Sequence, residues 1–540
     1  MAAFPEVADW TAPIEQTTVA SLLDRSAARH PSVSAIEFRD RHISFAALKE
    51  QVDRVAAGLL RSGIGKGDAV ALYLPNTPWH PVCFFALARI GAPVVHLSAV
   101  DAVRELEHKL SDSGARTLIT TDLPGLLPNS VRLLEQRRVD RVFLCEDGFW
   151  GEAPSLPVPW GEHLGALPQD DPPSIWPELQ PSDLCLLQYT GGTTGLPKGA
   201  MLSHGNLTAA LSSYRLWHDP LYGGAGSERI ITVLPLFHIY ALTTLLLRGI
   251  ADGFEVMLRP RFDPAILLDD IGRKRATIFA GVPTMWIGLL NHPGAAECDY
   301  SSLHSCITGG APLPLEIETK VSRLLGQRLR SGWGMTETGP AGTRVPTTVP
   351  PSAGLIGIPL PGIDMCILDR DHPARPLPCG EVGEIAIRGA NVCSGYWRRP
   401  EENAASFHDG WFLTGDIGRV DEKGLFTLLD RKKNMIISSG YNVYPAAIEN
   451  AIHEHPDVAE AAVIGVPDPY RGQAAKAFVT LRPGSAPLDL ERLKEFLADR
   501  LGRHEMPAAL EIRDSLPRSP AGKLLRRALA ETEPTREKKP

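Results

Sequence analysis

The sequence lacks the features that would place this protein on nucleic acid, in a membrane or among metal and disulfide scaffolds. Its 540 residues carry a formal net charge of −8, which argues against a general nucleic-acid binder and against a broad basic membrane patch. No apolar run reaches the roughly 20 residues needed to span a bilayer, and the first residues lack the basic and apolar regions of a signal peptide. The eight cysteines are scattered without a CxxC pair, so neither a zinc site nor a redox pair is indicated. We therefore expect a soluble cytoplasmic protein with no nucleic-acid partner.

Length and hydrophobic pattern predict more than one domain. A chain of 540 residues exceeds one typical core. Amphipathic stretches such as 45–62 alternate with short apolar runs such as 93–97, and this alternation predicts a layered α/β arrangement. Segment 34–45 is predicted to be a hairpin with its turn at 40–41, whereas 122–180, rich in proline, glycine and acidic residues, is interpreted as a surface excursion.

The stretch from Tyr189 to Gly199 is the most informative part of the sequence, with four glycines, three threonines and one lysine in eleven residues. Glycines let backbone amides approach an anion closely, threonine hydroxyls bond phosphate oxygens, and Lys198 adds a positive charge. The GxxxxGK[ST] phosphate loop is excluded, because Gly199 rather than serine or threonine follows Lys198. We expect a strand, a phosphate loop, a second strand and then a helix from about Asn206.

Later segments carry residues that each have an ordinary explanation when taken singly. A histidine beside phenylalanine, as at His238, is usually packed in a core, and acids or lysines such as Glu337 and Lys523 are usually solvated. The specific signal is the order in which the segments follow the glycine-rich stretch. These segments are 234–242, 305–313, 331–338, 414–416, 429–437, 439–445 and 517–524.

Taken together, these motifs resemble those of the AMP-forming adenylating enzymes, a superfamily of acyl-CoA synthetases, adenylation domains and firefly luciferase. The resemblance covers nearly the whole chain and is strongest to bacterial medium- or long-chain fatty-acid CoA ligases. It implies an α/β fold in which a large layered N-terminal domain, residues 1–429, is joined through a hinge at 430–435 to a small α+β C-terminal domain at 436–540.

The resemblance also implies how ATP is bound. The implied ATP-binding residues are Thr190, Gly191, Gly192, Thr193, Thr194, Gly195, Lys198, Gly309, Gly310, Ala311, Gly332, Trp333, Gly334, Met335, Thr336, Asp416, Arg431 and Lys523. In this set Thr336 bonds the α-phosphate, and Asp416 accepts from the ribose hydroxyls because a carboxylate accepts from two donors. Mg2+ on ATP is expected at Glu337 and Thr190, since a hard cation prefers oxygen ligands.

Further roles follow from the same resemblance. The implied catalytic residues are Lys523, Glu337, Thr336 and Lys198, and the implied acid-binding residues are His238, Gly310 and Gly334. The implied CoA-binding residues are Ser439, Gly440, Tyr441 and Arg471, and the domain pivot is Lys433. Arg471 fits a solvated surface cation equally well.

Several positions depart from the pattern of the superfamily. Trp333 stands where tyrosine is usual, Asn434 where aspartate is frequent, and Ala447 where glutamate is common. Adenylation domains that load amino acids usually carry aspartate in place of His238, to pair with the substrate ammonium. The histidine therefore favours a carboxylic acid without an α-amino group.

The implied reaction is ATP-dependent activation of a carboxylic acid, preferably a medium- or long-chain fatty acid, to an acyl-adenylate and transfer to CoA. ATP, Mg2+ and CoA are the expected cofactors and co-substrates. An aromatic- or dicarboxylic-acid CoA ligase and transfer to a carrier protein remain alternatives. A non-catalytic protein that binds nucleotide and acyl groups is an alternative of another class. The sequence leaves acyl length, peripheral membrane contact and homodimer formation open.

Overall fold

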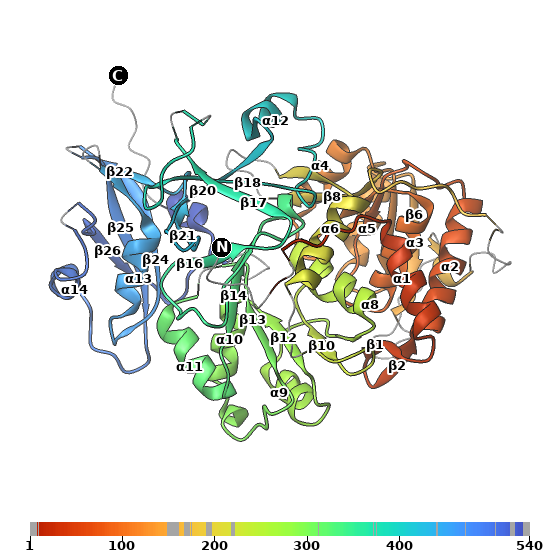
Figure 1. Cartoon of the computed structure of the whole chain (residues 1–540), viewed down its shortest axis with the longest axis horizontal. Helices are drawn as coiled ribbons and strands as arrows, with labels where there is room; N and C mark the ends of the chain where they lie inside the picture. Colours follow the sequence, from red (N-terminus) through yellow and green to blue (C-terminus); the bar gives the residue numbers. More distant parts are fainter. Residues whose placement is uncertain are drawn as a thin grey trace.

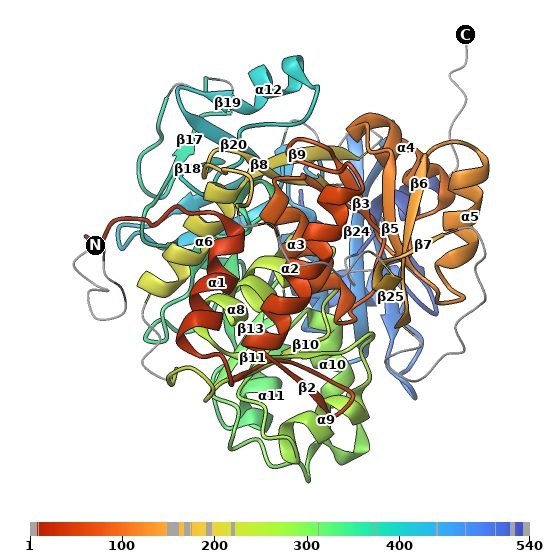
Figure 2. The same cartoon turned by 90° about the vertical axis from the view of Figure 1, so that its right-hand side faces the viewer.

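The computed structural model describes residues 8, 10–147, 161–166, 173, 175–190, 197–217, 222–311, 313–370, 372–373, 375–438, 441–469, 471–502, 504–518 and 524–532. They form a large body with two sheets and a smaller body with one, at the blue end of the chain (Figures 1 and 2). The predicted α/β fold, a large N-terminal domain followed by a smaller C-terminal one, is confirmed. None of the described helices combines the length and the apolar character that crossing a bilayer requires.

The first sheet of the large body has seven strands in the order β7-β6-β5-β3-β4-β8-β9. All neighbours are parallel except β8 and β9, which form an antiparallel pair. The strands are β3 (Val70–Leu72), β4 (Val94–His96), β5 (Thr117–Thr121), β6 (Arg141–Cys145), β7 (Glu162–His163), β8 (Leu184–Thr190) and β9 (Lys198–Ser203). Apart from β7 at the edge, the parallel strands are short and largely buried, as expected where both faces of a sheet are covered.

The helices of this part are α3 (Trp79–Ile90), α4 (Val103–Ser113), α5 (Leu127–Glu135) and α6 (His204–Leu216), with a 3-10 turn at Leu164–Ala166. Every residue of α3 is buried, as its apolar sequence predicts. Helix α6 begins two residues before the expected Asn206, because Ser203 and Asn206 form a capping box.

The interpretation of 122–180 as a surface excursion is wrong for residues 127–145 and for the short strand β7 at 162–163. Residues 127–145 supply helix α5 and strand β6, and β6 lies inside the sheet with Val142 to Cys145 buried. The apolar run is only a few residues long, and the surrounding prolines, glycines and acids masked it in the average composition of the segment.

The second sheet of the large body has 14 strands. Its order is β17-β18-β20-β21-β16-β15-β14-β13-β12-β10-β11-β1-β2, with β19 paired to β20. The strands are β1 (Ser34–Phe38), β2 (Arg41–Ser44), β10 (Arg229–Thr232), β11 (Glu255–Leu258), β12 (Ile278–Gly281), β13 (Ser305–Thr308), β14 (Arg330–Trp333), β15 (Thr343–Arg344), β16 (Leu355–Pro359), β17 (Ile363–Leu368), β18 (Gly383–Gly389), β19 (Phe407–His408), β20 (Trp411–Val420) and β21 (Phe426–Arg431). From β1 through β11, β10, β12 and β13 to β14 the strands are parallel, and the others are antiparallel.

The helices around this sheet are α1 (Val19–Arg29), α2 (Phe45–Arg61), α7 (Ile239–Ala241), α8 (Arg248–Asp252), α9 (Pro264–Gly272), α10 (Pro283–Leu290), α11 (Leu315–Leu325) and α12 (Pro400–Ser406). A π-helical segment, Leu242–Leu247, joins α7 to α8, and 3-10 turns occupy Pro293–Ala295 and Thr336–Thr338. The predicted hairpin of β1 and β2 is present, but its turn is Arg39-Asp40, one residue before the expected place. Both turn residues have positive φ, 54° and 59°, as a type I′ turn requires.

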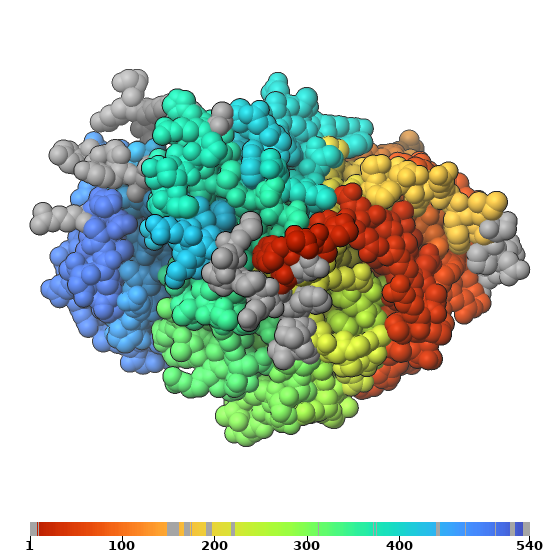
Figure 3. Space-filling view, in the orientation of Figure 1, coloured from red at the N-terminus to blue at the C-terminus, as the bar shows by residue number. Residues whose placement is uncertain are grey.

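The smaller body follows β21 and has a five-stranded sheet in the order β23-β22-β25-β24, with β26 paired to β25. Its elements are β22 (Ile436–Ser438), β23 (Tyr441–Val443), α13 (Pro445–His453), β24 (Val458–Asp468), β25 (Gly472–Leu481), α14 (Leu490–Leu497), β26 (Ala509–Ile512) and α15 (Arg526–Glu531). It has a hydrophobic core of its own, in which Ile448, Val463 and Leu493 are buried. Figure 3 shows it against the large body, where Arg482 lies 3.7 Å from Glu316.

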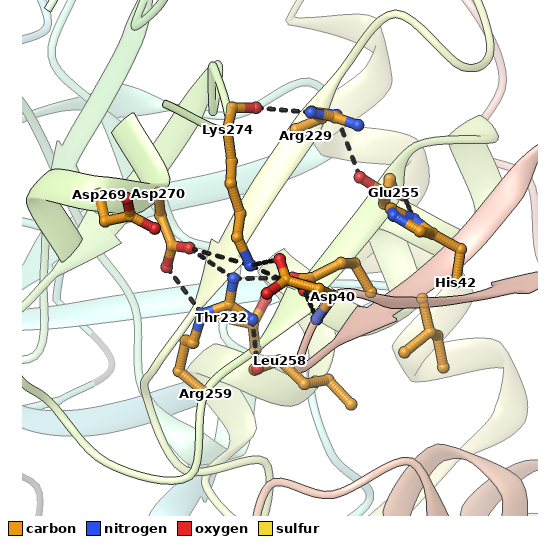
Figure 4. Close-up of polar contacts among 12 residues, drawn as sticks. Asp40, His42, Arg229, Thr232, Glu255, Leu258, Arg259, Asp269, Asp270 and Lys274 are labelled. Atoms are coloured by element: carbon orange, nitrogen blue, oxygen red, sulfur yellow. Dashed lines mark hydrogen bonds and ion pairs between the residues drawn. The ribbon is translucent and has the colours of Figure 1, made fainter. Parts of the chain in front are cut away.

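A buried group of charges fastens the first hairpin to the large sheet (Figure 4). Arg259 follows β11 and binds Asp270 of α9 through two hydrogen bonds, 2.7 and 2.5 Å, while Glu37 of β1 lies 2.7 Å away. Lys274 completes the group at 3.0 Å from Glu37. Burial alone would raise the pKa of Glu37, but Arg259 and Lys274 hold that pKa below its usual range. The two cations thus keep a carboxylate ionised in the interior.

We predict that Arg259→Ala destabilises the large body by about 3–5 kcal/mol, because it leaves two buried carboxylates without their main partner. The urea midpoint, followed by tryptophan fluorescence, measures the loss. Arg273→Ala is the matched control, since Arg273 pairs with Asp269 at the surface and should cost less than about 1 kcal/mol. Equal shifts for the two variants would contradict the role of the buried group.

Candidate active site

A cavity of about 1480 Å³ is lined by residues from all three sheets. Strands β8 and β9 contribute Thr190 and Lys198, and the segments after β13 and β14 contribute Gly309 and Glu337. The cavity therefore includes the carboxyl ends of parallel strands, where α/β folds commonly bind ligands. Residues of the smaller body, including Arg526, line the opposite side.

Glu337 is a buried carboxylate beside this cavity, with only 4% of its surface exposed. The Tyr396 hydroxyl donates a hydrogen bond of 2.7 Å to its Oε1, and the Cys393 amide donates to its backbone carbonyl. Burial raises the pKa of Glu337, and the Tyr396 hydrogen bond offsets only part of that rise. A bound cation would favour the ionised form of this carboxylate.

Lys198 lies at the base of the glycine-rich loop, opposite Thr190 in the antiparallel ladder of β8 and β9. Its ammonium forms an ion pair with Glu402 and lies 5.7 Å from the centre of the Tyr396 ring. The same tyrosine thus contacts both Lys198 and Glu337, which sequence analysis had assigned to one reaction.

Asp416 is almost fully buried, and two side chains hold it. The Trp333 indole nitrogen donates a 2.8 Å hydrogen bond to Oδ2, and Arg431 Nε lies 3.2 Å from Oδ1. Within the described residues Oδ1 accepts no hydrogen bond, so it can accept one from a ligand hydroxyl. Tryptophan at position 333 therefore supplies a hydrogen-bond donor to Asp416.

The glycines at the cavity are required by close backbone contacts. A Cβ on Gly334 would lie 1.5 Å from the Pro340 carbonyl oxygen, and one on Gly332 would lie 2.5 Å from that of Thr343. A Cβ on Gly309 would meet the Tyr240 ring at 3.0 Å. These small residues therefore let neighbouring chain segments approach one another closely, whatever they contact in a bound ligand.

His238 lines the cavity with Gly310, Gly334 and Ala311. Its ring accepts a hydrogen bond from the Tyr240 amide and so caps the short helix α7. The preceding carbonyl, of Phe237, accepts from the Gln188 amide group at 2.9 Å. Gln188 lies on β8, two residues before Thr190. Its side chain therefore links β8 to the segment that contains His238.

The connection between the two bodies also lines the cavity, through Arg431, Lys433 and Asn434. The Asn434 amide donates to one oxygen of Asp430, and the backbone amide of Ala446 donates to the other. Asn434 thus donates to a carboxylate, which an aspartate at this position could not do. Burial and Arg431 lower the pKa of Lys433.

Because position 447 is alanine, Glu449 is the acidic residue of helix α13. Glu449 forms an ion pair with Arg526 at 2.6 Å and accepts a hydrogen bond from the Val463 amide. The departure at position 447 therefore does not remove the contact between α13 and the segment that ends the chain.

Some sequence-predicted site residues lie elsewhere or outside the described residues. Arg471 is not among the described residues that line the cavity, and its amide donates to Asp468. Tyr441 is described by its backbone in β23. The residues outside the described part are Gly191, Gly192, Thr193, Thr194, Gly195, Ser439, Gly440 and Lys523. Arg518 and Leu524, on either side of Lys523, do line the cavity.

Tyr396, Glu402 and Gln188 were missed by sequence reasoning. Tyr396 stands in a Ser-Gly-Tyr-Trp run with no charged residue, and Glu402 lies in the first turn of the short helix α12. Only three-dimensional contacts join them to Lys198 and Glu337. No group of three metal-binding side chains occurs among the described residues, although Glu337 and Thr190 both line the cavity.

The profile of the AMP-binding enzyme family matches residues 23–397, and that of the AMP-binding enzyme C-terminal domain matches 447–523. The chain belongs to the AMP-binding enzyme family. This AMP-binding enzyme is 36% identical to a long-chain-fatty-acid–CoA ligase of Bacillus subtilis, over 99% of this chain and 98% of the relative. It is 38% identical to a feruloyl-CoA synthase of Amycolatopsis, over 93% and 96%. The ATP-bound crystal structure of MatB from Rhodopseudomonas palustris superposes with a TM-score of 0.84 at 30% identity, covering 95% of this chain and 98% of MatB.

The interpretation of the sequence as an AMP-forming acyl-CoA synthetase is confirmed at the level of the family. The first profile matches residues of the large body, and the second matches residues of the smaller body. The assignment of individual site residues, and the boundaries 1–429, 430–435 and 436–540, stay predictions.

We predict that Trp333→Phe raises the KM for ATP about tenfold or more, because it removes a hydrogen bond to a buried carboxylate while keeping an aromatic ring. Initial rates of pyrophosphate release against ATP concentration measure the effect, and the KM for the acid should change less. Trp397→Phe is the matched control, since the Trp397 indole nitrogen has no hydrogen-bond partner within the described residues. An unchanged KM for ATP in Trp333→Phe would contradict a nucleotide role for Asp416.

Proposed function

We propose that this AMP-binding enzyme joins ATP and a carboxylic acid to an acyl-adenylate and transfers the acyl group to CoA. The observation that carries the proposal is the convergence of Lys198, Glu337, Asp416 and Arg431 on one cavity with His238. Binding alone would not require this combination of a paired lysine, a buried cavity carboxylate and a half-satisfied aspartate. The acid has an extended acyl chain and no α-amino group. The B. subtilis relative is named for acids of this class.

Charge governs the first half-reaction. The substrate carboxylate oxygen attacks the α-phosphorus of ATP, pyrophosphate leaves with the bonding electron pair, and a mixed anhydride with AMP forms. Two anions must approach for this, and preorganised positive charge offsets their repulsion where negative charge develops. Lys198 and Lys523 serve that purpose, Thr336 bonds the α-phosphate, and Asp416 with Arg431 binds the ribose.

Mg2+ fits the residues present. Glu337 has one oxygen bonded to Tyr396, so the carboxylate is held in place and can offer an oxygen to a cation carried by ATP; Thr190 lines the same cavity. The ion would supply charge neutralisation at the phosphates. Removal of divalent cations should therefore abolish pyrophosphate release.

The second half-reaction needs a different catalytic surface. We propose that the smaller body turns about Lys433, withdrawing the segment that contains Lys523 and bringing Ser439, Gly440 and Tyr441 toward the acyl-adenylate. The CoA thiol gives up its proton, its sulfur bonds to the acyl carbon, and AMP leaves. Arg471 is the candidate contact for a CoA phosphate.

The first experiment measures pyrophosphate release with ATP, Mg2+ and a panel of acids, with and without CoA. CoA-dependent turnover and acyl-CoA formation are expected. Pyrophosphate release without acyl-CoA formation would indicate another acceptor such as a carrier protein. No release with any acid would favour a non-catalytic binding protein.

We predict that Lys523→Ala loses adenylation by about a hundredfold or more, as removal of a charge-stabilising group does, and retains thioester formation from supplied acyl-adenylate. The two half-reactions are measured separately, as pyrophosphate release and as acyl-CoA formation. Lys494→Ala is the control, because Lys494 pairs with Glu491 on the surface of the same body. Equal loss of both half-reactions would refute this division of roles.

A further inference from the structure

A buried polar pair, His96 and Gln188, joins two neighbouring strands of the first sheet beside the cavity. Strands β4 and β8 are parallel, and their register pairs Val95 with Leu187. The next step of this register brings His96 level with Gln188, near the carboxyl ends of both strands. Both side chains line the cavity, and they are only 2% and 5% exposed. The pair is thus part of the cavity wall, although the reaction proposed above gives it no role.

The hydrogen bonds of this pair fix the orientation of the Gln188 amide. Its nitrogen lies 2.9 Å from the Phe237 carbonyl oxygen, which can only accept a hydrogen bond. The amide oxygen must therefore face His96, whose Nδ1 lies 3.1 Å away. Because that oxygen also only accepts, Nδ1 of His96 carries a proton and donates the hydrogen bond. A series of hydrogen bonds thus runs from His96 through Gln188 to Phe237.

The surroundings of His96 keep its ring neutral and in one place. Burial lowers the pKa of His96 to about 4, and the hydrogen bond with Gln188 opposes only part of that change. A neutral ring has one N–H donor, so the proton on Nδ1 leaves Nε2 without one. The Phe84 ring of helix α3 stacks on the imidazole, with the ring centres 5.8 Å apart. His96 therefore presents a single fixed donor to Gln188.

The series of hydrogen bonds ends on the segment that carries His238. Nδ1 of His238 accepts from the Tyr240 amide at 3.3 Å, so the proton of the neutral ring lies on Nε2, where it can be donated to a carboxylate. At its other end, Gln188 shares one face of β8 with Thr190, since alternate residues of a strand face the same side. The Gln188 side chain therefore connects the acid-binding segment to the strand that leads into the glycine-rich loop.

We propose, on the basis of the ligase function above, that His96 is a positioning residue for acyl-adenylate formation, which holds Gln188 in the one amide orientation that fixes the His238 segment to β8. The substrate carboxylate oxygen must meet the α-phosphorus in line, and a misplacement of about 1 Å can cost about a hundredfold in rate. Without the donor on His96, the Gln188 amide is free to turn away from the Phe237 carbonyl. This role requires no contact between His96 and a substrate.

A matched pair of variants isolates the donor. Asparagine places an amide nitrogen where Nδ1 of His96 lies, whereas leucine has nearly the same shape and no donor. We expect His96→Leu to lower the single-turnover rate of pyrophosphate release about tenfold to a hundredfold, with half-saturation by ATP nearly unchanged. His96→Asn should restore most of this rate. The probe is the panel acid on which the unaltered enzyme is fastest, and equal rates in the two variants would overturn the role of the donor.

The second half-reaction separates positioning from general damage. In supplied acyl-adenylate the bond between acid and phosphorus already exists, so thioester formation with CoA should be nearly the same in His96→Leu and the unaltered enzyme. Equal loss of both half-reactions would show a structural role only and would overturn the proposal.

His80→Phe is the control for packing against His96. The two histidine rings have centres 5.2 Å apart, but the ring nitrogens of His80 have no hydrogen-bond partner among the described residues. Another ring at this position should therefore alter neither half-reaction. Should His96→Leu fail to fold, His96→Gln takes its place, because glutamine carries its amide nitrogen where Nε2 lies and not where Nδ1 lies.

A double-mutant cycle tests whether His96 acts through Gln188. Gln188→Met removes the amide at nearly constant length and should slow pyrophosphate release at least as much as His96→Leu. In the double variant the loss of His96 should cost little more, because residues of one hydrogen-bond network are coupled. Losses that multiply would refute the path through Gln188. Absence of pyrophosphate release with every acid in the unaltered enzyme would instead refute the ligase function on which this inference rests.

Discussion

One tyrosine holds together the parts that the cavity needs. The Tyr396 hydroxyl fixes Glu337, and its ring lies beneath the Lys198 ammonium. Its backbone neighbours cross to β9, where the Met201 amide donates to the Gly395 carbonyl and the Trp397 amide to that of Gly199. The segment around Tyr396 therefore joins the first sheet to the second at the glycine-rich loop. It adds to the direct contact between β9 and the Thr336–Thr338 turn in holding the lysine and the glutamate near each other.

Much of the architecture could be predicted because local patterns agreed with the fold. The stretches 45–62 and 93–97 form α2 and β4, and the helix expected from about Asn206 begins at His204. Strand β6 was missed because its apolar residues are few and stand within a segment whose composition resembles a loop. The turn of the first hairpin was displaced by one residue, since Arg39 and Asp40 adopt positive φ without a glycine to announce it.

Site residues that stand in a recognisable motif could be predicted from the sequence. Site residues that matter only through their three-dimensional contacts could not. Glu337, Asp416 and Lys198 stand in recognisable strings, and the fold brings them to one cavity. Tyr396 and Glu402 stand in no such string, and sequence alone does not show which residues approach them. Trp333 illustrates an intermediate case, because the substitution was visible in the sequence but its hydrogen bond to Asp416 was not.

The ion pair between Lys198 and Glu402 has a consequence for nucleotide exchange. The lysine is already neutralised before any polyphosphate arrives. In the proposed reaction, a ligand phosphate at Lys198 takes the place of a carboxylate, so the gain in binding is the difference between two ion pairs rather than the whole of one. When pyrophosphate leaves, Glu402 can form its ion pair with Lys198 again. Glu402 thus weakens the binding of polyphosphate and makes the release of pyrophosphate easier, which suits a site that must be emptied in every turnover.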